Sequence, residues 1–236
     1  MQDFTNTYDS SAANAMPALR ASFIRKTYLL VAAAILAFIV VEAFLFASGA
    51  AYAIATVVFS GGSIGWLAVL ALFMGVSYLA NRWAVSETSP IVPYIGFAIY
   101  IIAEAIIFVP LLMIAAYASG DGAVILEAGV VAIGLFLGIT ATVFLTRADF
   151  SFLGPILAIG GFAALGFIVA GALFGFTLGN VFAFVMVAFA GSAILYNTSN
   201  VLHRFNTNQH VAAALTLFAS VALLFWYVLR IFSSRR

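Results

Sequence analysis

Residues 93–117 read PYIGFAIYIIAEAIIFVPLLMIAAY, an apolar run in which Glu104 is the one charged residue. A bilayer core about 30 Å thick needs about 20 such residues for one helical crossing. Similar runs lie at residues 27–47, 64–81, 123–146, 152–175, 180–202 and 211–231. A transmembrane strand would instead alternate apolar and polar residues over about 10 positions, which none of these runs does. The sequence therefore predicts an all-α polytopic membrane protein, a seven-transmembrane-helix bundle.

The composition excludes whole classes of protein. Of the 236 residues, 66% are hydrophobic and 7% are charged, whereas a soluble domain has about 25% charged residues. Soluble enzymes and nucleic-acid-binding domains are thereby excluded, and a net charge of +1 provides no field that attracts nucleic acid. We expect membrane lipid to surround the protein. Because the chain has no cysteine, no nucleophile motif and no metal-binding signature, we expect no enzymatic activity, no cofactor and no metal site.

The chain divides into a short polar tail and one apolar domain. Residues 1–22 have no basic start and no clear cleavage site, so we expect an uncleaved N-terminal tail. Residues 23–236 are expected to form a single seven-span transmembrane domain, because no break between spans is long enough for a soluble domain. Segment 51–60 is apolar but short, and is either an extension of the first span or an interfacial piece. The last loop is flanked by His203 and His210, which we expect to be solvated.

Basic residues predict the orientation, because cytoplasmic loops carry an excess of Lys and Arg. A cytoplasmic N-terminus places six basic residues on that side: Arg20, Arg25, Lys26, Arg82, Arg147 and Arg204. Three others would then lie on the far side, unless the last segment re-enters the membrane instead of crossing it: Arg230, Arg235 and Arg236. We also expect three tryptophans to lie at the membrane interface, since each falls near a span end: Trp66, Trp83 and Trp226.

Three carboxylates lie within the predicted spans: Glu42, Glu104 and Glu127. Glu104 is nearest the middle of its span, where a charged side chain costs about 2.5–3.5 kcal/mol to insert. Pro110, on the same span, removes a backbone donor and frees the carbonyl of Ile106. A carboxylate beside a freed carbonyl would make a stopping point for a cation or a proton. The alternative is a protonated Glu104 that bonds a neighbouring helix, with Pro110 only kinking the chain. Glu42 either shares a polar pocket with Glu104 or reaches the outer headgroups, whereas Glu127 is expected to reach the headgroups.

Two sets of glycines recur at every fourth residue, a spacing that lets helices approach closely in lipid. They are Gly134 with Gly138, and Gly171 with Gly175 and Gly179. We expect this close packing to occur within the monomer, with a dimer interface as the alternative.

Several stretches resemble a known family. Residues 195–205 (LYNTSNVLHRF) resemble the sixth-span signature of the Bax inhibitor-1 family, in its bacterial branch. Residues 211–218 (VAAALTLF), followed by Leu229-Arg230, look like that family's last helix. Residues 146–154 (TRADFSFLG) resemble its entry into the fifth span, and residues 23–28 (FIRKTY) resemble its usual opening. The resemblance covers nearly the whole chain.

This resemblance implies a seven-helix protein of the bacterial inner (plasma) membrane, in which six helices surround a central last helix. Some members of the family are pH-sensitive calcium leaks, in which two aspartates on the last two spans share a proton. At those two positions this chain has Asn197 and Ser220. Neither side chain titrates in the relevant range, so the two-aspartate pH sensor cannot operate here. An Asn–Ser pair would instead hydrogen-bond across the two helices.

Two functions follow as hypotheses. The first is a calcium or other cation leak that relies on Glu104, together with Glu42, in place of the aspartate pair. The second is a non-transporting interaction protein, either a regulator of a membrane-anchored protease or an accessory subunit of a larger membrane complex.

Overall fold

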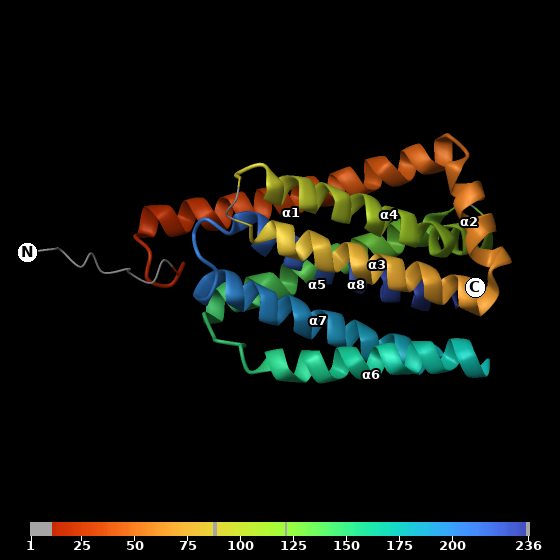
Figure 1. Cartoon of the computed structure of the whole chain (residues 1–236). Coiled ribbons are helices and arrows are strands. Elements are labelled where there is room, and N and C mark those ends of the chain that lie inside the picture. The colour runs from red at the N-terminus through yellow and green to blue at the C-terminus, as the bar shows by residue number, and fades with distance from the viewer. Residues whose placement is uncertain (1–10, 87–88, 121, 235–236) are drawn as a thin grey trace, which may run out of the picture.

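The computed structural model describes residues 11–86, 89–120 and 122–234. In these residues the helices are α1 (Pro17–Ala47), α2 (Ala50–Ser60), α3 (Gly62–Ala84), α4 (Val92–Ser119), α5 (Ala123–Thr146), α6 (Leu153–Phe174), α7 (Asn180–His203) and α8 (His210–Ser233). All of them except α2 are long and apolar enough to cross a membrane (Figure 1). A helix pairs its backbone N–H and C=O groups internally, which is necessary because the hydrocarbon of a membrane offers no hydrogen-bond partners. The expected all-α, seven-span architecture is confirmed.

The first span begins earlier than predicted. Helix α1 starts at Pro17 rather than at residue 27. Proline is well suited to the first position of a helix, because the backbone N–H at that position makes no hydrogen bond within the helix and proline lacks this N–H. Residues 17–22, assigned to the polar tail, therefore belong to the helix. The segment before them is anchored as well, since the backbone N–H of Ala12 donates to the carbonyl of Phe205 at 2.8 Å. Residues 1–10 of the predicted tail lie outside the described residues.

Segment 51–60 forms a helix of its own. Helix α1 ends at Ala47, and Gly49 follows with φ +79°, a left-handed conformation that glycine adopts without steric cost. The chain then turns, and Figure 1 shows α2 lying across the end of the bundle. The segment is thus not an extension of the first span, and its interfacial location stays a prediction.

The start of α1 and the end of α8 lie at opposite ends of the bundle (Figure 1). Helix α8 runs from one end to the other, so the last segment crosses the bundle and does not turn back. At its far end, the Arg230 guanidinium donates to the carbonyl of Leu178, and Ser234 Oγ donates to Asn180 Oδ1 at 2.8 Å. Six basic residues share the end where α1 begins, which we call the basic end: Arg20, Arg25, Lys26, Arg82, Arg147 and Arg204. Arg235 and Arg236 lie outside the described residues.

Helix α8 is the central helix of the bundle. The consecutive residues 211–215 are all buried, so the first turn of α8 is covered on every side. It packs against α1, α3, α4, α5 and α7, whereas α6 packs on α7 and α3 at the edge. Small residues such as Ala213, Ala214 and Ala222 let the neighbouring helices approach closely. The expectation of a central last helix is confirmed.

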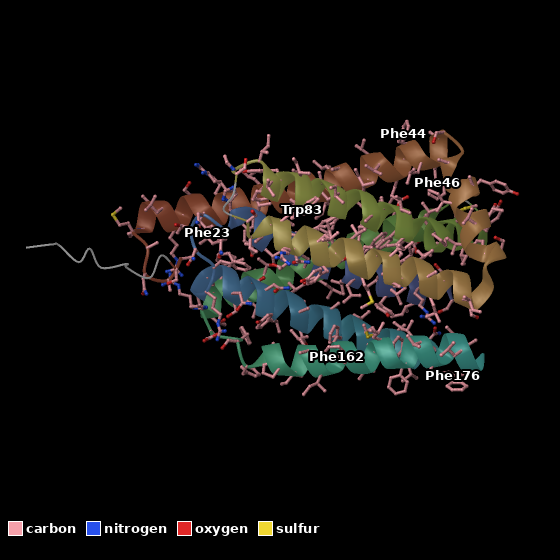
Figure 2. The ribbon with its side chains drawn as sticks, viewed as in Figure 1. Phe23, Phe44, Phe46, Trp83, Phe162 and Phe176 are labelled. Carbon is pink, nitrogen blue, oxygen red and sulfur yellow. The ribbon has the colours of Figure 1, made fainter. Side chains whose placement is uncertain are left out.

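The outer surface is apolar, as a surface in contact with lipid requires. Figure 2 shows Phe44, Phe162 and Phe176 projecting from the outside of the bundle, and Phe44 and Phe162 are 67% and 78% exposed. Phe23, in contrast, is buried near the basic end.

The two glycine sets do not pack helices together as expected. A Cβ added at Gly134 or Gly138 would meet no atom within 4 Å, so this pair faces the outside of α5. Gly175 and Gly179 lie just beyond the ends of α6 and α7, and only Gly171 of that set packs closely, against Phe176.

A glycine outside these sets brings α3 and α4 together. A Cβ on Gly96 would lie 2.9 Å from Trp83 Cβ and 3.1 Å from the carbonyl oxygen of Ala80. Both atoms belong to the backbone or to the root of a side chain, so neither can move aside cheaply. The contact between α3 and α4 at the basic end therefore depends on glycine at position 96.

Gly96→Ala should lower the free energy of unfolding by about 1–3 kcal/mol, because the added methyl group overpacks this contact. Unfolding in mixed detergent micelles, followed by circular dichroism, measures the change. Gly134→Ala is the matched control, since its methyl group meets open space and should leave stability unchanged or raise it by up to about 1 kcal/mol. Equal effects of the two substitutions would contradict the packing argument.

Candidate functional site

Asn197 and Ser220 join α7 to α8 near the middle of the bundle. Asn197 Nδ2 donates to Ser220 Oγ at 2.8 Å and to the carbonyl of Thr216 at 3.3 Å. Ser220 Oγ in turn donates to the same carbonyl at 2.9 Å. The hydrogen bond expected between the last two spans is therefore present. Both side chains are neutral, so the link does not change charge with pH.

A second set of bonds ties the α5–α6 loop to α7 at the basic end. Ser199 Oγ accepts a hydrogen bond from the Phe150 N–H at 2.9 Å, and Ser199 is fully buried. In the same loop, the backbone N–H of Ser151 donates to Asp149 Oδ1 at 2.9 Å. This bond, together with the nearby positive charges of His203 and Arg204, lowers the pKa of the Asp149 carboxyl below its usual value. Asp149 therefore keeps its charge to a lower pH than an ordinary aspartate does.

Three buried hydroxyls face one another between α1, α5 and α7. They belong to Tyr28, Thr140 and Thr198, and Thr198 is fully buried. The hydroxyls of Thr140 and Thr198 lie close to the Tyr28 hydroxyl, but none of the three forms a hydrogen bond of good geometry within the part of the chain that the structure describes. Sequence reasoning missed this group. The sequence feature that could have indicated it is the polar run Asn197–Asn200, which interrupts an otherwise apolar span.

Glu104 is buried, and Pro110 does not lie beside its carboxylate. Glu104 is 6% exposed, its hydrogen-bond partner is Tyr100, one turn earlier on α4, and its Oε2 has no hydrogen-bond partner among the described residues. Helical side chains lean toward the helix N-terminus, whereas the Ile106 carbonyl freed by Pro110 points toward the C-terminus. The two groups point apart, so the structure does not support the predicted site made of Glu104 and this carbonyl.

Glu42 lies apart from the cavity that Glu104 lines. It is 7% exposed, and neither carboxylate oxygen has a partner among the described residues. Phe38, one turn earlier on the same buried face of α1, packs against Phe108 and Phe218. The cavity that Glu104 lines is formed without Glu42, so the structure does not bring the two carboxylates together. Glu127 is exposed near the start of α5, and its reach to the headgroups stays a prediction.

Three cavities follow one another along the face of α8 that looks toward α3 and α6. The Arg230 cavity has a volume of about 370 Å³, the Glu104 cavity about 160 Å³ and the Asn197 cavity about 240 Å³. We name each cavity after a residue that lines it. The Glu104 cavity meets the Asn197 cavity at Leu223. It shares four lining residues with the Arg230 cavity: Trp66, Ile168, Trp226 and Tyr227. The cavities thus form a row from the far end of α8 to its middle.

Trp66 and Trp226 lie inside this row. Their rings stack on each other, with centroids 6.0 Å apart. Sequence reasoning placed them at the interface because each is near a span end. The structure shows that they pair inside the bundle and line the Glu104 cavity, which could not be predicted without knowing that α3 and α8 are neighbours.

A fourth cavity opens at the basic end. The His210 cavity, about 530 Å³, lies between the α3–α4 and α7–α8 loops. Tyr94 Oη and His210 Nε2 share a hydrogen bond of 2.9 Å across its wall. His210 is thus half-buried and bonded to α4, not simply solvated as expected. This cavity has no lining residue in common with the Asn197 cavity, so the row is interrupted between Asn81 and Ala84.

A protein-family model and several known proteins are similar to this chain. A family model described as "Inhibitor of apoptosis-promoting Bax1" matches residues 20–236. Protein lifeguard 4 of Mus musculus is 26% identical over 236 aligned residues, covering 94% of this chain and 89% of that protein. An uncharacterized protein of Pseudomonas aeruginosa is 28% identical over 68% of each chain. Bax inhibitor 1 of Schizosaccharomyces pombe is 31% identical over 46% of this chain and 41% of that protein.

The Asn197–Ser220 bond should appear as a coupling energy of about 0.6 kcal/mol, and at most about 1.7 kcal/mol, as for other polar pairs in membranes. The measurement is a double-mutant cycle of Asn197→Leu and Ser220→Ala, followed by unfolding in mixed micelles. As the control, Ser192→Ala is paired with Ser220→Ala, because the Ser192 hydroxyl bonds only its own helix, at the carbonyl of Ala188. That second cycle should give no coupling. A coupling energy near zero in the first cycle would show that the Asn197–Ser220 bond does not stabilise the protein.

Proposed function

Since the chain belongs to the Bax inhibitor-1 family, we propose that this multi-pass membrane protein is a leak for calcium or another cation, with a role in ion homeostasis. In this proposal the path follows the row of cavities along α8, and Glu104 is the group that attracts the cation. The two-aspartate pH sensor of the leak members is replaced by Asn197 and Ser220.

The row of cavities carries the proposal. It occupies the side of α8 on which α6 stands at the edge of the bundle and leaves α8 incompletely covered. The side of α8 that faces α1 and α5 has one smaller cavity of about 100 Å³, whose lining residues are all apolar, Phe38 and Phe218 among them. The interruption between the Asn197 and His210 cavities fits a closed state, in which a small outward movement of α3 would join them.

The surroundings of Glu104 favour transient binding of a passing cation over stable binding. Calcium is held by about six to eight oxygen ligands. Among the described residues no group of three or more His, Asp or Glu side chains comes together, and Glu104 has only Tyr100 as a polar partner. A cation beside Glu104 would therefore keep most of its water and leave readily. A single carboxylate still lowers the barrier, because it opposes the cost of bringing positive charge into the membrane.

The membrane and the orientation are proposed from the distribution of basic residues and from the similarity to a bacterial protein. The six basic residues of the basic end would face the cytoplasm under the positive-inside rule, with the N-terminus on that side. A Pseudomonas aeruginosa protein among the relatives supports a bacterial inner membrane.

A second function, binding a partner protein in the membrane without transport, is favoured by the exposed glycines of α5. Gly134 and Gly138 have the spacing of a helix-docking surface and open space around them. The partner would be a membrane-anchored protease or a subunit of a larger complex. Co-purification in mild detergent discriminates, since a stoichiometric partner should be lost in a Gly134→Leu, Gly138→Leu variant. Purification of the protein alone under every mild condition contradicts this function.

Glu104→Gln should reduce calcium flux into proteoliposomes by at least about tenfold, which corresponds to about 1.4 kcal/mol in barrier height. The amide keeps the size of the side chain but removes the charge that attracts the cation. The measurement is fluorescence of an indicator inside the vesicles, at equal protein density.

Glu127→Gln serves as the control, because it makes the same chemical change at an exposed position outside the row of cavities. Its flux should match that of the wild type. Flux that survives Glu104→Gln unchanged would remove Glu104 from the path, and a wild type without flux at any condition would favour the partner-binding function.

Asn197→Asp combined with Ser220→Asp should create a pH dependence of flux between about pH 6 and pH 8 that exceeds that of the wild type. Two carboxylates at the present hydrogen-bond distance of 2.8 Å repel each other, so one holds its proton until the pH rises. Flux of both proteins is compared at the two pH values. The same pH profile in both would show that this position does not control the path.

A further inference from the structure

The wall of the Glu104 cavity is strongly aromatic. Rings from α3, α4 and α8 line the cavity together with Glu104, which is the one charged side chain among the lining residues. The rings pack in fixed arrangements: Phe108 meets Trp226 edge to face at 4.9 Å between centroids. The aromatic lining residues are Trp66, Phe73, Phe108, Trp226 and Tyr227.

Glu104 lines this cavity and has a buried acceptor oxygen that is not used. Its side chain is more than nine-tenths buried, and Oε2 has no hydrogen-bond partner among the described residues. Tyr100 satisfies only part of the carboxylate. A buried carboxylate oxygen without a partner is costly, so a positive group that entered the cavity would gain a partner that the protein does not supply.

Aromatic faces and one carboxylate are the chemistry that recognises an organic cation. The negative face of an aromatic ring attracts an ammonium group, most strongly at tryptophan. A quaternary or other substituted ammonium ion needs few oxygen ligands, because its charge is covered by carbon, whereas an inorganic cation needs many. We propose that the Glu104 cavity binds a lipophilic organic ammonium ion, with its charge beside Glu104 and its apolar part among the tryptophan rings.

The adjoining cavity accommodates the rest of such a ligand. The Glu104 cavity holds about 160 Å³ and continues into the Arg230 cavity of about 370 Å³ past Trp66 and Trp226. Arg230 lies at the far end of that space and donates to the carbonyl of Leu178. Its positive charge repels an ammonium group from that end. The ligand is therefore oriented with its charged group toward Glu104 and its apolar group toward Arg230. Binding at this site goes beyond cation leakage and does not depend on it.

Isothermal titration calorimetry on the purified full chain tests the proposal with benzyltrimethylammonium as the probe. The detergent and lipid must contain no choline. Saturable binding at one site is expected, and neopentylbenzene, in which carbon replaces the charged nitrogen, should bind at least about tenfold more weakly. Equal binding of the two probes, or no saturable binding of the cation, overturns the proposal.

Variants separate the two parts of the site. Glu104→Gln and Trp226→Leu should each weaken binding of the cation by at least about tenfold, whereas Trp226→Phe, which keeps a ring, should retain most of it. Glu127→Gln should bind as the wild type does. If Trp226→Leu does not fold, Trp66→Leu removes the other stacked ring and replaces it in the test. Full binding by Glu104→Gln overturns the proposal.

A lipid headgroup that carries a quaternary ammonium group is one source of this ligand. Repeating the titration in phosphatidylcholine nanodiscs identifies the source. Competition by this lipid assigns the site to a headgroup, and undiminished binding assigns it to a free cation. Calorimetry uses no ion gradient, so absence of calcium flux leaves this result standing, and absence of binding leaves the leak function open to its own test.

Discussion

A central helix surrounded by protein at membrane depth must find all of its polar partners inside the bundle. Helix α8 finds them at three levels. At its start, His210 bonds Tyr94 of α4; in its middle, Ser220 bonds Asn197 of α7; at its end, Arg230 bonds the carbonyl of Leu178 before α7. Between these levels α8 is buried through alanine, leucine and phenylalanine side chains. The three bonds fix the rotation of α8 about its axis and its position along that axis. The other helices pack against α8 in this arrangement.

The two sides of α8 differ because α6 stands at the edge. On one side, α1, α4 and α5 pack on α8, Phe38 packs against Phe108 and Phe218, and one small apolar cavity of about 100 Å³ remains. On the other side, α3 and α7 flank α8 while α6 packs on them from outside, which leaves the row of polar-lined cavities. Glu104 lines a cavity of this row, whereas Glu42 lines none of the cavities described above. A carboxylate that lines a cavity can exchange ligands, whereas a buried carboxylate that lines none of them cannot.

Hydropathy predicted the seven spans because the cost of burying polar groups in lipid acts on each segment separately. It missed the start of α1 at Pro17 because the first turns carry Arg20, Arg25 and Lys26, whose charges mask a helix that extends beyond the apolar run. The Asn197–Ser220 bond could be predicted because the family resemblance aligns two adjacent spans. The pairing of Trp66 with Trp226 could not, since span-end position suggests the interface and only the helix neighbours decide between interface and interior.

The same reasoning explains why the candidate site formed differently from its prediction. Glu104 and Pro110 are near in sequence, and nearness along a helix does not make a site, because side chains lean toward the N-terminus and carbonyls point the other way. The cavity that Glu104 lines instead is formed largely by aromatic side chains of α3 and α8 together with Phe108 of its own helix. A lone carboxylate in an aromatic cavity lacks the oxygen ligands that hold an inorganic ion in place. An inorganic cation there would therefore have to keep moving, while an organic one could stay.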